Sequence, residues 1–314
     1  MKTYNIITQL ICLKCNSNLS LNSIQKLECL QCQNSYPIIN GLPVVIDEDK
    51  SVFKFKHFYD QRNLFFDISK KGSVKARISA LLPSISLNRV SKSNFTYIEK
   101  CLIGLKSKPF VLILGGSIIG EGMSEFLNSP YIEVIESDVS FGPRTQLILD
   151  AHQIPFADQT FDCVIAQAVL EHVLDPVKCV EEIFRVLKPG GIVYTEIPFM
   201  QQVHGGAYDF TRYTMSGHRR LLRKFKEIKA GAIAGPGSAL AWSYVYFLFS
   251  LFGYTENLRL FLKVFGRITG FWLKYFDYIA SLNKRSIDGA SATFFLGTKS
   301  DQVFTEEEVI KYYK

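Results

Sequence analysis

An α/β fold with a mostly parallel sheet, preceded by a small metal-binding module, is predicted by three observations. Two C-x-x-C pairs begin at Cys12 and Cys29, close to the start of the chain. Short apolar segments that end in glycine or acidic residues then alternate with helical stretches between residues 110 and 200. Further on, a long uncharged stretch interrupts this pattern. The chain has 314 residues, 47% of them hydrophobic, which is enough for two folded units.

The cysteine spacing predicts metal binding near the start of the chain. Four of the seven cysteines form the two C-x-x-C pairs, a spacing that favours metal binding over disulfides in a reducing compartment. The remaining Cys101, Cys163 and Cys179 stand among apolar or helical residues, so we expect them to be small buried side chains. No signal-peptide pattern precedes the first pair, and the expected location is cytoplasmic.

The first expected module is a zinc ribbon over residues 1–48. Its ligands would be the four thiolates of Cys12, Cys15, Cys29 and Cys32, with 13 residues between the two pairs to form a short hairpin. Four thiolates complete a tetrahedron around one Zn²⁺ and leave no open position, so the metal is expected to be structural. Because so small a module has little core, its metal would supply on the order of 10 kcal/mol of folding free energy.

Residues 35–46, after the second pair, predict two short strands around the turn Asn40-Gly41. The two C-x-x-C pairs followed by Y-P-I-x-x-G-L-P resemble, over residues 8–48, the small zinc-ribbon family that activates tRNA and protein methyltransferases. Similar ribbons precede methyltransferase domains in bacterial proteins, so the resemblance implies such a domain downstream. A ribbon that binds nucleic acid or a partner protein is the alternative.

A linker with one or two helices is expected over residues 49–108, which are rich in Lys, Ser, Asn and Phe. A strand buried on both faces follows at residues 110–114, because this run is continuously apolar. It stops at residues 115–122, G-G-S-I-I-G-E-G, where glycines allow positive φ and let the backbone approach a ligand. A strand, a glycine loop and a helix in this order are typical of nucleotide-binding sheets.

Three more strands are expected, at residues 131–135, 146–149 and 161–166. The first leads to Asp138, which by register is placed to accept hydrogen bonds from two ribose hydroxyls, with Glu136 as the second choice. The second strand ends at Asp150 and the third at Gln167. The gap between the first two of these strands is too short for a full crossover helix.

Four motifs stand in order along this region: D-A-x-x-I-P-F at 150–156, F-D-x-V at 161–164, L-E-H-V at 170–173 and R-V-L-K-P-G-G at 185–191. Together they resemble class I S-adenosylmethionine-dependent methyltransferases over residues 110–200, which implies a Rossmann-like, seven-stranded sheet. The resemblance implies these roles: Gly115, Gly116 and Ser117 line the methionine and ribose part of the cofactor, Asp138 holds the ribose, Asp150 and the backbone of Ala151 meet the adenine, and Gln167 lies near the sulfonium.

The glycine loop departs from the family pattern, because G-G-S-x-x-G-x-G replaces the usual G-x-G-x-G and Ser117 stands where the family has glycine. His172, just after the fourth strand, has two interpretations: a catalytic residue near the methyl acceptor, or a residue that holds a loop. Glu171 beside it is expected to be structural.

The acceptor site is expected in the polar loop 200–214, which follows a fifth strand at 192–197 and lies beyond the carboxyl ends of the strands. His204 and Asp209 are candidates to take a proton from an attacking hydroxyl or amine. Tyr208 and Arg212 are candidates to contact the substrate, with Arg212 holding a carboxylate or phosphate. The alternative is that these loop residues only join the loop to the sheet.

A basic cluster follows, where the formal net charge of +7 is concentrated. It comprises Arg212, Arg219, Arg220, Arg223, Lys224, Lys226 and Lys229. A helix at 214–225 and a strand at 228–233 are expected to carry it. The cluster is interpreted as a solvated helix face, with an anion site as the alternative.

The methyltransferase domain is expected over 109–300, with a helical apolar insertion near the C-terminus at about 238–285, a last strand at 292–297 and a tail at 301–314. Residues 238–254 carry no charge but fall short of the ~20 residues of a membrane span. The insertion is expected to pack on the sheet or on a second subunit in a homodimer. Association of 238–278 with a membrane surface, helped by three basic residues, is the alternative.

These features predict an S-adenosylmethionine-dependent methyltransferase with structural Zn²⁺. Its unidentified acceptor is expected to be a small molecule, a sugar or a lipid-linked intermediate, because the basic cluster and the insertion suit an anionic, partly lipidic substrate. Methylation of RNA or protein in the translation apparatus is the second hypothesis, and no recognisable single-stranded nucleic-acid platform supports it. A non-catalytic, cofactor-binding scaffold is the third, favoured by the altered glycine loop.

Overall fold

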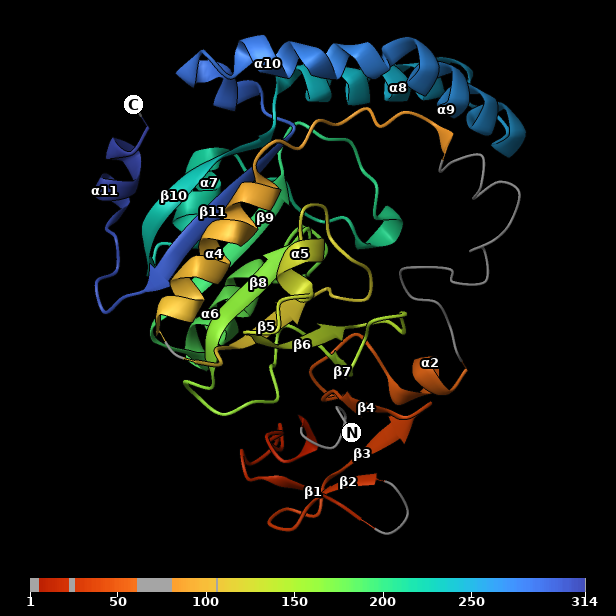
Figure 1. Cartoon of the computed structure of the whole chain (residues 1–314). Coiled ribbons are helices and arrows are strands. Elements are labelled where there is room, and N and C mark those ends of the chain that lie inside the picture. The colour runs from red at the N-terminus through yellow and green to blue at the C-terminus, as the bar shows by residue number, and fades with distance from the viewer. Residues whose placement is uncertain (1–5, 23–25, 61–80, 106, 314) are drawn as a thin grey trace.

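The computed structural model describes residues 6–22, 26–60, 81–105 and 107–313. Their strands form one continuous sheet in the order β1-β2-β3-β4-β7-β6-β5-β8-β9-β11-β10 (Figure 1). The strands are β1 (Leu19–Leu21), β2 (Lys26–Cys29), β3 (Ser35–Ile39), β4 (Leu42–Val45), β5 (Phe110–Leu114), β6 (Glu133–Asp138), β7 (Leu147–Leu149), β8 (Phe161–Gln167), β9 (Leu187–Pro198), β10 (Phe225–Ala234) and β11 (Ala292–Lys299).

The sheet is longer than the seven strands expected, because the ribbon continues it. Strands β4 to β9 are parallel wherever they pair with one another, and β11 is antiparallel to both β9 and β10. The ribbon strand β4 pairs with β7, with Val44 opposite Ile148. The α/β fold is confirmed. Of the eleven strands of the described residues, β5 to β11 lie within the expected methyltransferase region and β1 to β4 lie in the ribbon.

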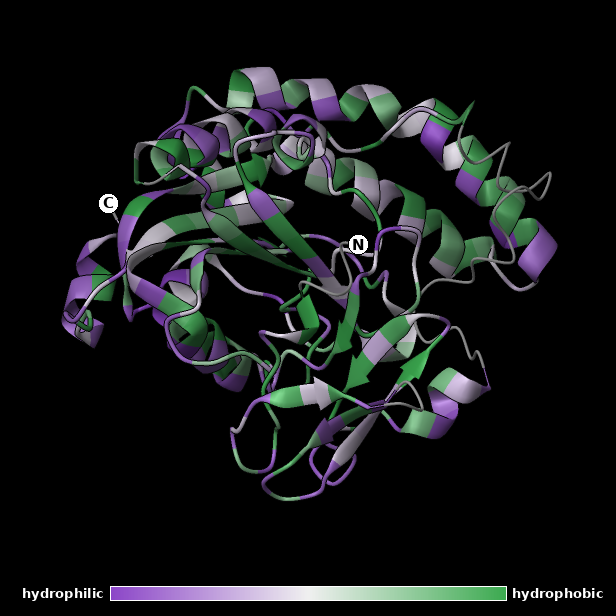
Figure 2. Ribbon diagram, turned by 60° about the horizontal axis from the view of Figure 1, so that its bottom comes forward, coloured by the Kyte–Doolittle hydropathy of each residue, from purple (hydrophilic) through white to green (hydrophobic). Residues whose placement is uncertain are grey.

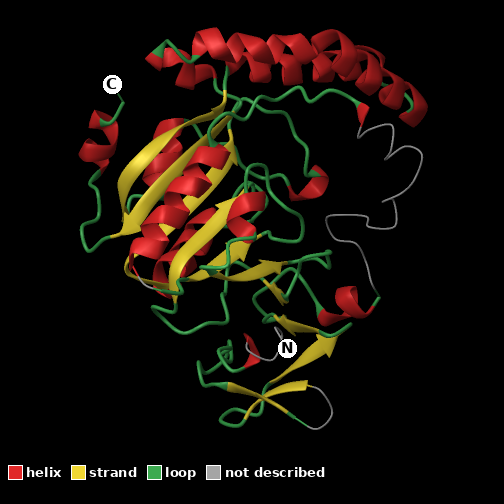
Figure 3. Cartoon of the chain, viewed as in Figure 1, coloured by secondary structure: helices red, strands yellow, loops and turns green. Residues whose placement is uncertain are grey.

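Both faces of the central strand β5 are buried, which explains its unbroken apolar run. Leu112 and Leu114 face a core that contains Ile183 of α6 (Pro176–Val186). Val111 and Ile113 face the opposite core, to which α4 (Ser91–Leu105) contributes three side chains. Successive side chains of a strand point to opposite faces, so two helical layers are needed (Figure 3).

The expected elements of the ribbon are present. β1 and β2 form an antiparallel hairpin, and β3 and β4 form a second one. Asn40 (φ 52°) and Gly41 (φ 77°) make the turn of the second hairpin in the left-handed region, as an Asn-Gly pair favours. The ribbon is therefore an antiparallel module joined edge to edge with the parallel sheet.

Several expected boundaries are wrong. The helix after the glycine loop is only α5 (Ser124–Leu127), and the basic helix is shortened to α7 (Met215–Leu221). β9 begins at Leu187, five residues before the expected start, with a register shift against β8 between Phe161 and Cys163. The expected linker contains α2 (Phe55–Tyr59) and α4, and part of it lies outside the described residues.

A layer of helices between β10 and β11 lies across the carboxyl end of the sheet, at the top of Figure 1. It consists of α8 (Pro236–Phe252), α9 (Glu256–Gly270), η3 (Phe271–Tyr275), α10 (Phe276–Ala280) and η4 (Lys284–Gly289). Among the described residues, no helix has both the length and the apolar character needed to cross a membrane. The chain ends with α11 (Glu306–Lys311), beside β10.

The outer surface of this layer is apolar as well as basic. Hydrophobic side chains of these helices are exposed. In Figure 2 the ribbons of these helices alternate between hydrophobic and hydrophilic colours. The exposed side chains include Phe247, Phe252, Phe261, Phe265, Ile268, Trp272, Tyr275 and Ile279. So large an exposed apolar area is typical of an interaction surface.

The basic cluster is largely neutralised within the chain. Arg219 pairs with Glu227 at 2.8 Å, and Arg220 and Arg223 share the α11 carboxylate of Glu306. Elsewhere, Lys224 lies 3.5 Å from a glutamate of α6 and Arg212 is bound to an aspartate of its own loop. These pairs favour the interpretation as a solvated structural face.

Candidate active site

A cavity of about 850 Å³ opens at the carboxyl ends of the parallel strands. It is lined by the ends of five strands and the loops that follow them: Leu114 and Gly115 after β5, Asp138 in β6, Asp150 and Ala151 after β7, Gln167 in β8, and Glu196 in β9. In open parallel sheets this edge is where ligands bind. Five of the seven expected cofactor residues line it: Gly115, Asp138, Asp150, Ala151 and Gln167.

Gly116 and Ser117 do not line this cavity. Their backbone N–H groups instead bind residues of β6, Ser137 and Asp138. Gly115 has φ +71°, and a Cβ there would lie 2.5 Å from Val169. Gly116 N–H donates to the carbonyl of Ser137 at 2.8 Å, which ties the loop to β6. The next residues of the loop, Ile118 to Glu121, reach the cavity in place of Gly116 and Ser117.

Asp138 and Glu136 have different environments, which distinguishes the two candidate acids. Asp138 is buried against the cavity and accepts from the backbone N–H groups of Ser117 (3.1 Å) and Ser140 (2.9 Å). Burial raises the pKa of Asp138. Glu136 forms a two-pronged ion pair with Arg144, at 2.6 and 2.7 Å. Its carboxylate is therefore occupied, and only Asp138 faces the cavity.

Asp150 is held on both oxygens. Ser51, just after the ribbon, donates its hydroxyl to Oδ2 at 2.5 Å, and His152 contacts Oδ1 at 2.5 Å through Nδ1. Burial opposes ionisation, but these hydrogen bonds leave the pKa of Asp150 lowered overall. The carboxylate thus stays charged at the cavity wall, with a residue from the N-terminal part of the chain beside it.

A buried polar network centred on Glu196 also lines the cavity, and none of the sequence motifs indicated it. Glu196 accepts from Ser91 and Tyr194, each at 2.6 Å, and from Gln167 at 3.0 Å. Gln167 also donates to the carbonyl of Glu121 at 3.0 Å. Burial raises the pKa of both Glu121 and Glu196. An acid within the otherwise apolar strand β9 was the available sequence signal.

Glu171, His172 and His204 come together at another part of the cavity wall. Glu171 Oε1 lies 3.7 Å from His172 Nε2 and 3.9 Å from His204 Nε2. The Glu171 side chain is fully buried, and burial raises its pKa to about 8. His172 Nδ1 lies 2.6 Å from the carbonyl of Tyr208, so His172 also holds the loop. Burial lowers the pKa of His172.

Asp209 and Arg212 fix the loop and do not line the cavity. Arg212 binds Asp209 and also donates to the carbonyl of Gln201 at 2.9 Å. Asp209 accepts from the N–H groups of His204 (2.7 Å) and Gly205 (3.0 Å). Although burial opposes it, the guanidinium and these donors hold the pKa of Asp209 well below its usual range. In this arrangement Asp209 and Arg212 are bound to each other and to the backbone of the loop, and the cavity is lined by His204 and Tyr208 of the same loop.

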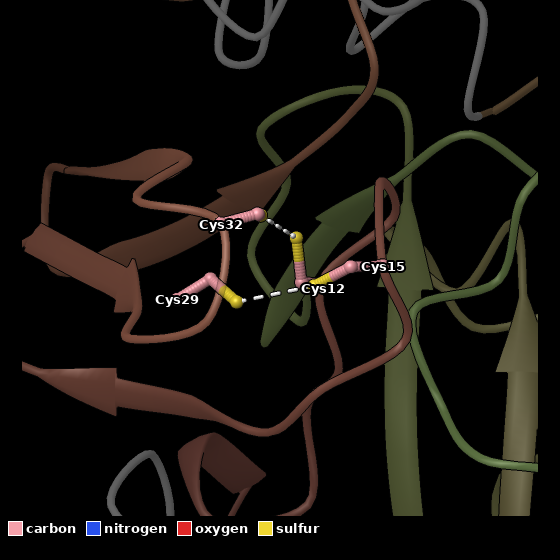
Figure 4. A group of neighbouring side chains, drawn as sticks. All are labelled: Cys12, Cys15, Cys29 and Cys32. Carbon is pink, nitrogen blue, oxygen red and sulfur yellow. Dashed lines mark hydrogen bonds between the residues drawn. The ribbon is translucent and has the colours of Figure 1, made fainter.

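The four ribbon cysteines form a compact cluster (Figure 4). Their sulfur atoms all lie within 4.8 Å of one another, with Cys12 and Cys32 3.5 Å apart and Cys15 and Cys29 3.3 Å apart. Sulfurs at ~2.3 Å from a tetrahedral Zn²⁺ are about 3.8 Å apart, so the set is compatible with one structural zinc. Hydrogen bonding from Ser17 lowers the pKa of Cys15 to about 6, which favours its thiolate.

The two cysteine turns have the same backbone geometry. Asn16 and Gln33 each follow the second cysteine of a pair and adopt positive φ, 60° and 59°. Each donates its N–H to the carbonyl of the first cysteine, Cys12 or Cys29, at 2.8 Å. The sharp turns direct both sulfurs of each pair to one point, which the C-x-x-C spacing predicts.

Residues 128–195 match the family model described as a methyltransferase domain. The chain therefore contains a methyltransferase domain. It is 50% identical over 42 residues to the ubiquinone/menaquinone biosynthesis C-methyltransferase UbiE of Haemophilus ducreyi, covering 13% of this chain and 16% of that protein. It is 33% identical over 116 residues to the demethylmenaquinone methyltransferase of Bacillus pumilus, covering 34% and 50%. The chain thus spans at most half the length of either relative.

Among solved structures, the chain is similar to phosphoethanolamine N-methyltransferase 2 of Haemonchus contortus in complex with S-adenosyl-L-methionine. The TM-score is 0.44 at 17% identity, over 82% of this chain and 62% of that one.

The matched part of the methyltransferase domain holds Asp138, Asp150, Gln167 and the Glu171-His172 pair. The expected class I S-adenosylmethionine-dependent domain is confirmed for this segment. The glycine loop, the ribbon and the loop that carries His204 lie outside it.

Proposed function

We propose that the chain is an S-adenosylmethionine-dependent methyltransferase. The observation that carries the proposal is the cavity at the carboxyl ends of the parallel strands, lined within the matched domain by Asp138, Asp150 and Gln167. In this proposal the domains are the ribbon 1–48, the connecting region 49–108, the methyltransferase domain 109–300 with its apolar helical insertion at about 238–285, and the tail 301–314.

Residues around the cavity suit the parts of the cofactor. Asp138 would accept from the ribose hydroxyls, and Asp150 with the backbone of Ala151 would meet the adenine. Gly115 would let the backbone approach the ligand. Gln167 would lie by the sulfonium, held there by its bonds to Glu196 and Glu121. S-adenosylmethionine supplies an already activated methyl group when bound.

The protein's main task is then to align the acceptor with the methyl group and to exclude water. Glu171, His172 and His204 line the cavity beside the loop 200–214, where the acceptor would bind. Tyr208 also lines the cavity, and its backbone carbonyl orients the ring of His172. Asp209 and Arg212 keep the loop closed over this end, which gives them a positioning role in place of direct contact.

A small, sugar or lipid-linked acceptor fits the surroundings of the cavity best. The insertion lies over the loop that carries His204, with Ser243 and Tyr246 of α8 bonded to Gln202 and Val203. The exposed apolar side chains of this layer suit contact with a lipid surface or a second copy of the chain in a homodimer. The internally paired basic cluster gives less support to an RNA acceptor.

Calorimetric titration with S-adenosylmethionine tests the proposal. Removing the charged acceptor of Asp138 should cost about 1–3 kcal/mol of cofactor binding, so Asp138→Ala should bind roughly tenfold to a hundredfold more weakly. Glu136→Gln is the matched control, because Glu136 is bound to Arg144 and should leave the affinity unchanged.

Three results separate the hypotheses. Absence of binding to the wild-type protein would refute the assignment as an enzyme. Tight binding without S-adenosylhomocysteine formation in cell extract would favour the non-catalytic scaffold. Binding that yields S-adenosylhomocysteine only with extract would support the enzyme and start the search for the acceptor.

A further inference from the structure

The buried carboxylate of Glu171 is the least explained polar group in the cavity. Its side chain is 0% exposed, and neither of its oxygens has a hydrogen-bond partner in the described structure. A buried, unpaired carboxylate costs several kcal/mol, so such a group is normally paired or bound to a metal. The nearest side-chain nitrogens, at 3.7 and 3.9 Å in His172 and His204, are too distant for direct hydrogen bonds.

Both imidazoles are oriented with Nε2 toward Glu171. His172 Nδ1 lies 2.6 Å from the Tyr208 carbonyl, which can only accept, so this nitrogen carries the proton and Nε2 carries the lone pair. His204 Nδ1 lies 3.3 Å from the carbonyl of Gln202 and 3.7 Å from Asp209. Metal-bound histidines are oriented in this way, with the second nitrogen donating to a carbonyl or carboxylate.

The separations fit an ion between the three groups. The carboxylate oxygen and both nitrogens lie within 4.8 Å of one another. Ligands about 2.1 Å from a tetrahedral ion are on the order of 3.4 Å apart. The two oxygen–nitrogen separations, 3.7 and 3.9 Å, are within a few tenths of an ångström of this spacing. The two rings meet edge to face with centroids 5.1 Å apart, which brings both nitrogens to the same side of Glu171.

We propose that Glu171, His172 and His204 bind a divalent first-row transition metal of the Zn²⁺ type, with an open position facing the cavity. Two histidines and one carboxylate leave at least one position for an outside ligand. The backbone N–H bond from His204 to Asp209, which is itself fixed by Arg212, holds the third ligand in place. In this proposal, the Arg212–Asp209 ion pair fixes the loop so that His204 stays in position as a metal ligand.

The role of this metal rests on the proposed function. An acceptor hydroxyl bound at the open position would be acidified and release its proton to water. Its oxygen would then form the bond to the methyl carbon as the carbon–sulfur bond breaks, leaving a neutral thioether. The metal would therefore select an acceptor with an oxygen donor.

Metal content of the full-length protein tests the site. After equilibration with micromolar Zn²⁺ and removal of free metal, the wild-type protein should hold two ions, one in the ribbon and one here. Glu171→Gln and His204→Gln should each hold one. Because Gln has the shape of Glu and carries no charge, Glu171→Gln should remain folded, and circular dichroism checks this. His57→Gln, a histidine of α2 outside the cavity, should keep two ions.

Cobalt substitution identifies which ion is lost. Co²⁺ in the ribbon should show sulfur-to-metal charge transfer, and the second Co²⁺ should show only the weaker bands of nitrogen and oxygen ligands. One ion in the wild-type protein, or two in both variants, would overturn the inference. Calorimetry with S-adenosylmethionine on the wild-type protein separates the two proposals: binding with a single metal ion leaves the function standing, and two ions without binding leave only the metal site.

Discussion

His218 of α7 is buried between two hydroxyls on the sheet. Its Nε2 lies 2.7 Å from Thr195 of β9 and its Nδ1 lies 3.0 Å from Thr293 of β11. The residue is 0% exposed, and burial lowers its pKa to about 3. The neutral ring therefore belongs to the folded state, whereas the unfolded chain binds a proton near pH 6.5.

Stability should fall as the pH falls below 6.5. Because the folded pKa lies below the unfolded one, the unfolded state takes up the proton first, and the stabilisation is lost between pH 6.5 and about 3. From pH 7.5 to 5, His218 alone should cost about 2 kcal/mol in the free energy of unfolding. Urea unfolding at both pH values should show this loss in the wild-type protein and a smaller one in His218→Gln. Equal losses would contradict the prediction.

The placement of a site residue was predictable where it depends only on the end of a strand. Asp138 and Asp150 follow apolar strands, and the register of a parallel sheet brings such positions to one edge. The ion pair of Asp209 and Arg212 was not predictable, because only the folded loop brings their carboxylate and guanidinium together. Glu171 was expected to be structural. The sequence does not show that the Glu171 oxygens lack hydrogen-bond partners, nor that His204, 33 residues further along the chain, lies close to them.

At the scale of elements, a carboxylate of α10 caps the start of α8 and so joins two helices of the insertion. Asp277 of α10 accepts from the N–H groups of Gly235 (3.0 Å) and Gly237 (2.7 Å) and from the Ser238 hydroxyl (2.6 Å), all at the start of α8. A carboxylate there satisfies unpaired backbone donors and is favoured by the helix dipole. Gly235 itself has no side chain to supply this cap.

Removing this cap should destabilise the insertion. Asp277→Ala removes the acceptor of four donors, the N–H groups of Gly235, Gly237 and Ser238 and the Ser238 hydroxyl, and should lower the free energy of unfolding by about 1–3 kcal/mol. Asp277→Asn should lose less, because its amide oxygen still accepts a hydrogen bond. Urea unfolding measures both variants, with Asp288→Ala, an exposed partner of Tyr313, as the control. Equal stability of Asp277→Ala and the control would show that water replaces the cap.

The parallel strands were the most predictable elements, because burial of both faces gives them unbroken apolar runs such as residues 110–114. Their ends were not. β9 extends back to Leu187 through Pro189 and two glycines, residues that local preference places in a turn, because it pairs with β8 as far as Phe161. The cap of α8 was equally hidden, since Asp277 lies about forty residues from its partners.

At the scale of the whole molecule, the ribbon and the methyltransferase domain share one sheet and one core. β4 pairs with β7, and the N–H of Ile11 donates to the carbonyl of Pro155 at 3.0 Å. Leu10 of the ribbon and Phe156 of the domain are buried in the same hydrophobic cluster. Just past β4, Ser51 reaches Asp150 at the cavity.

Loss of the ribbon zinc should weaken cofactor binding. Without metal, the two C-x-x-C turns of the ribbon should lose their fixed geometry. β4 and Ser51 should then be held less firmly beside β7. Losing the hydrogen bond to Asp150 alone should cost about 0.5–1.5 kcal/mol, a twofold to tenfold fall in S-adenosylmethionine affinity by calorimetry. Cys15→Ser and Cys29→Ser are the appropriate changes, because a chelator would also strip the proposed acceptor-site metal. Cys101→Ser, outside the ribbon, is the matched control, and unchanged affinity in the two ribbon variants would mean that Asp150 is positioned by the methyltransferase domain alone.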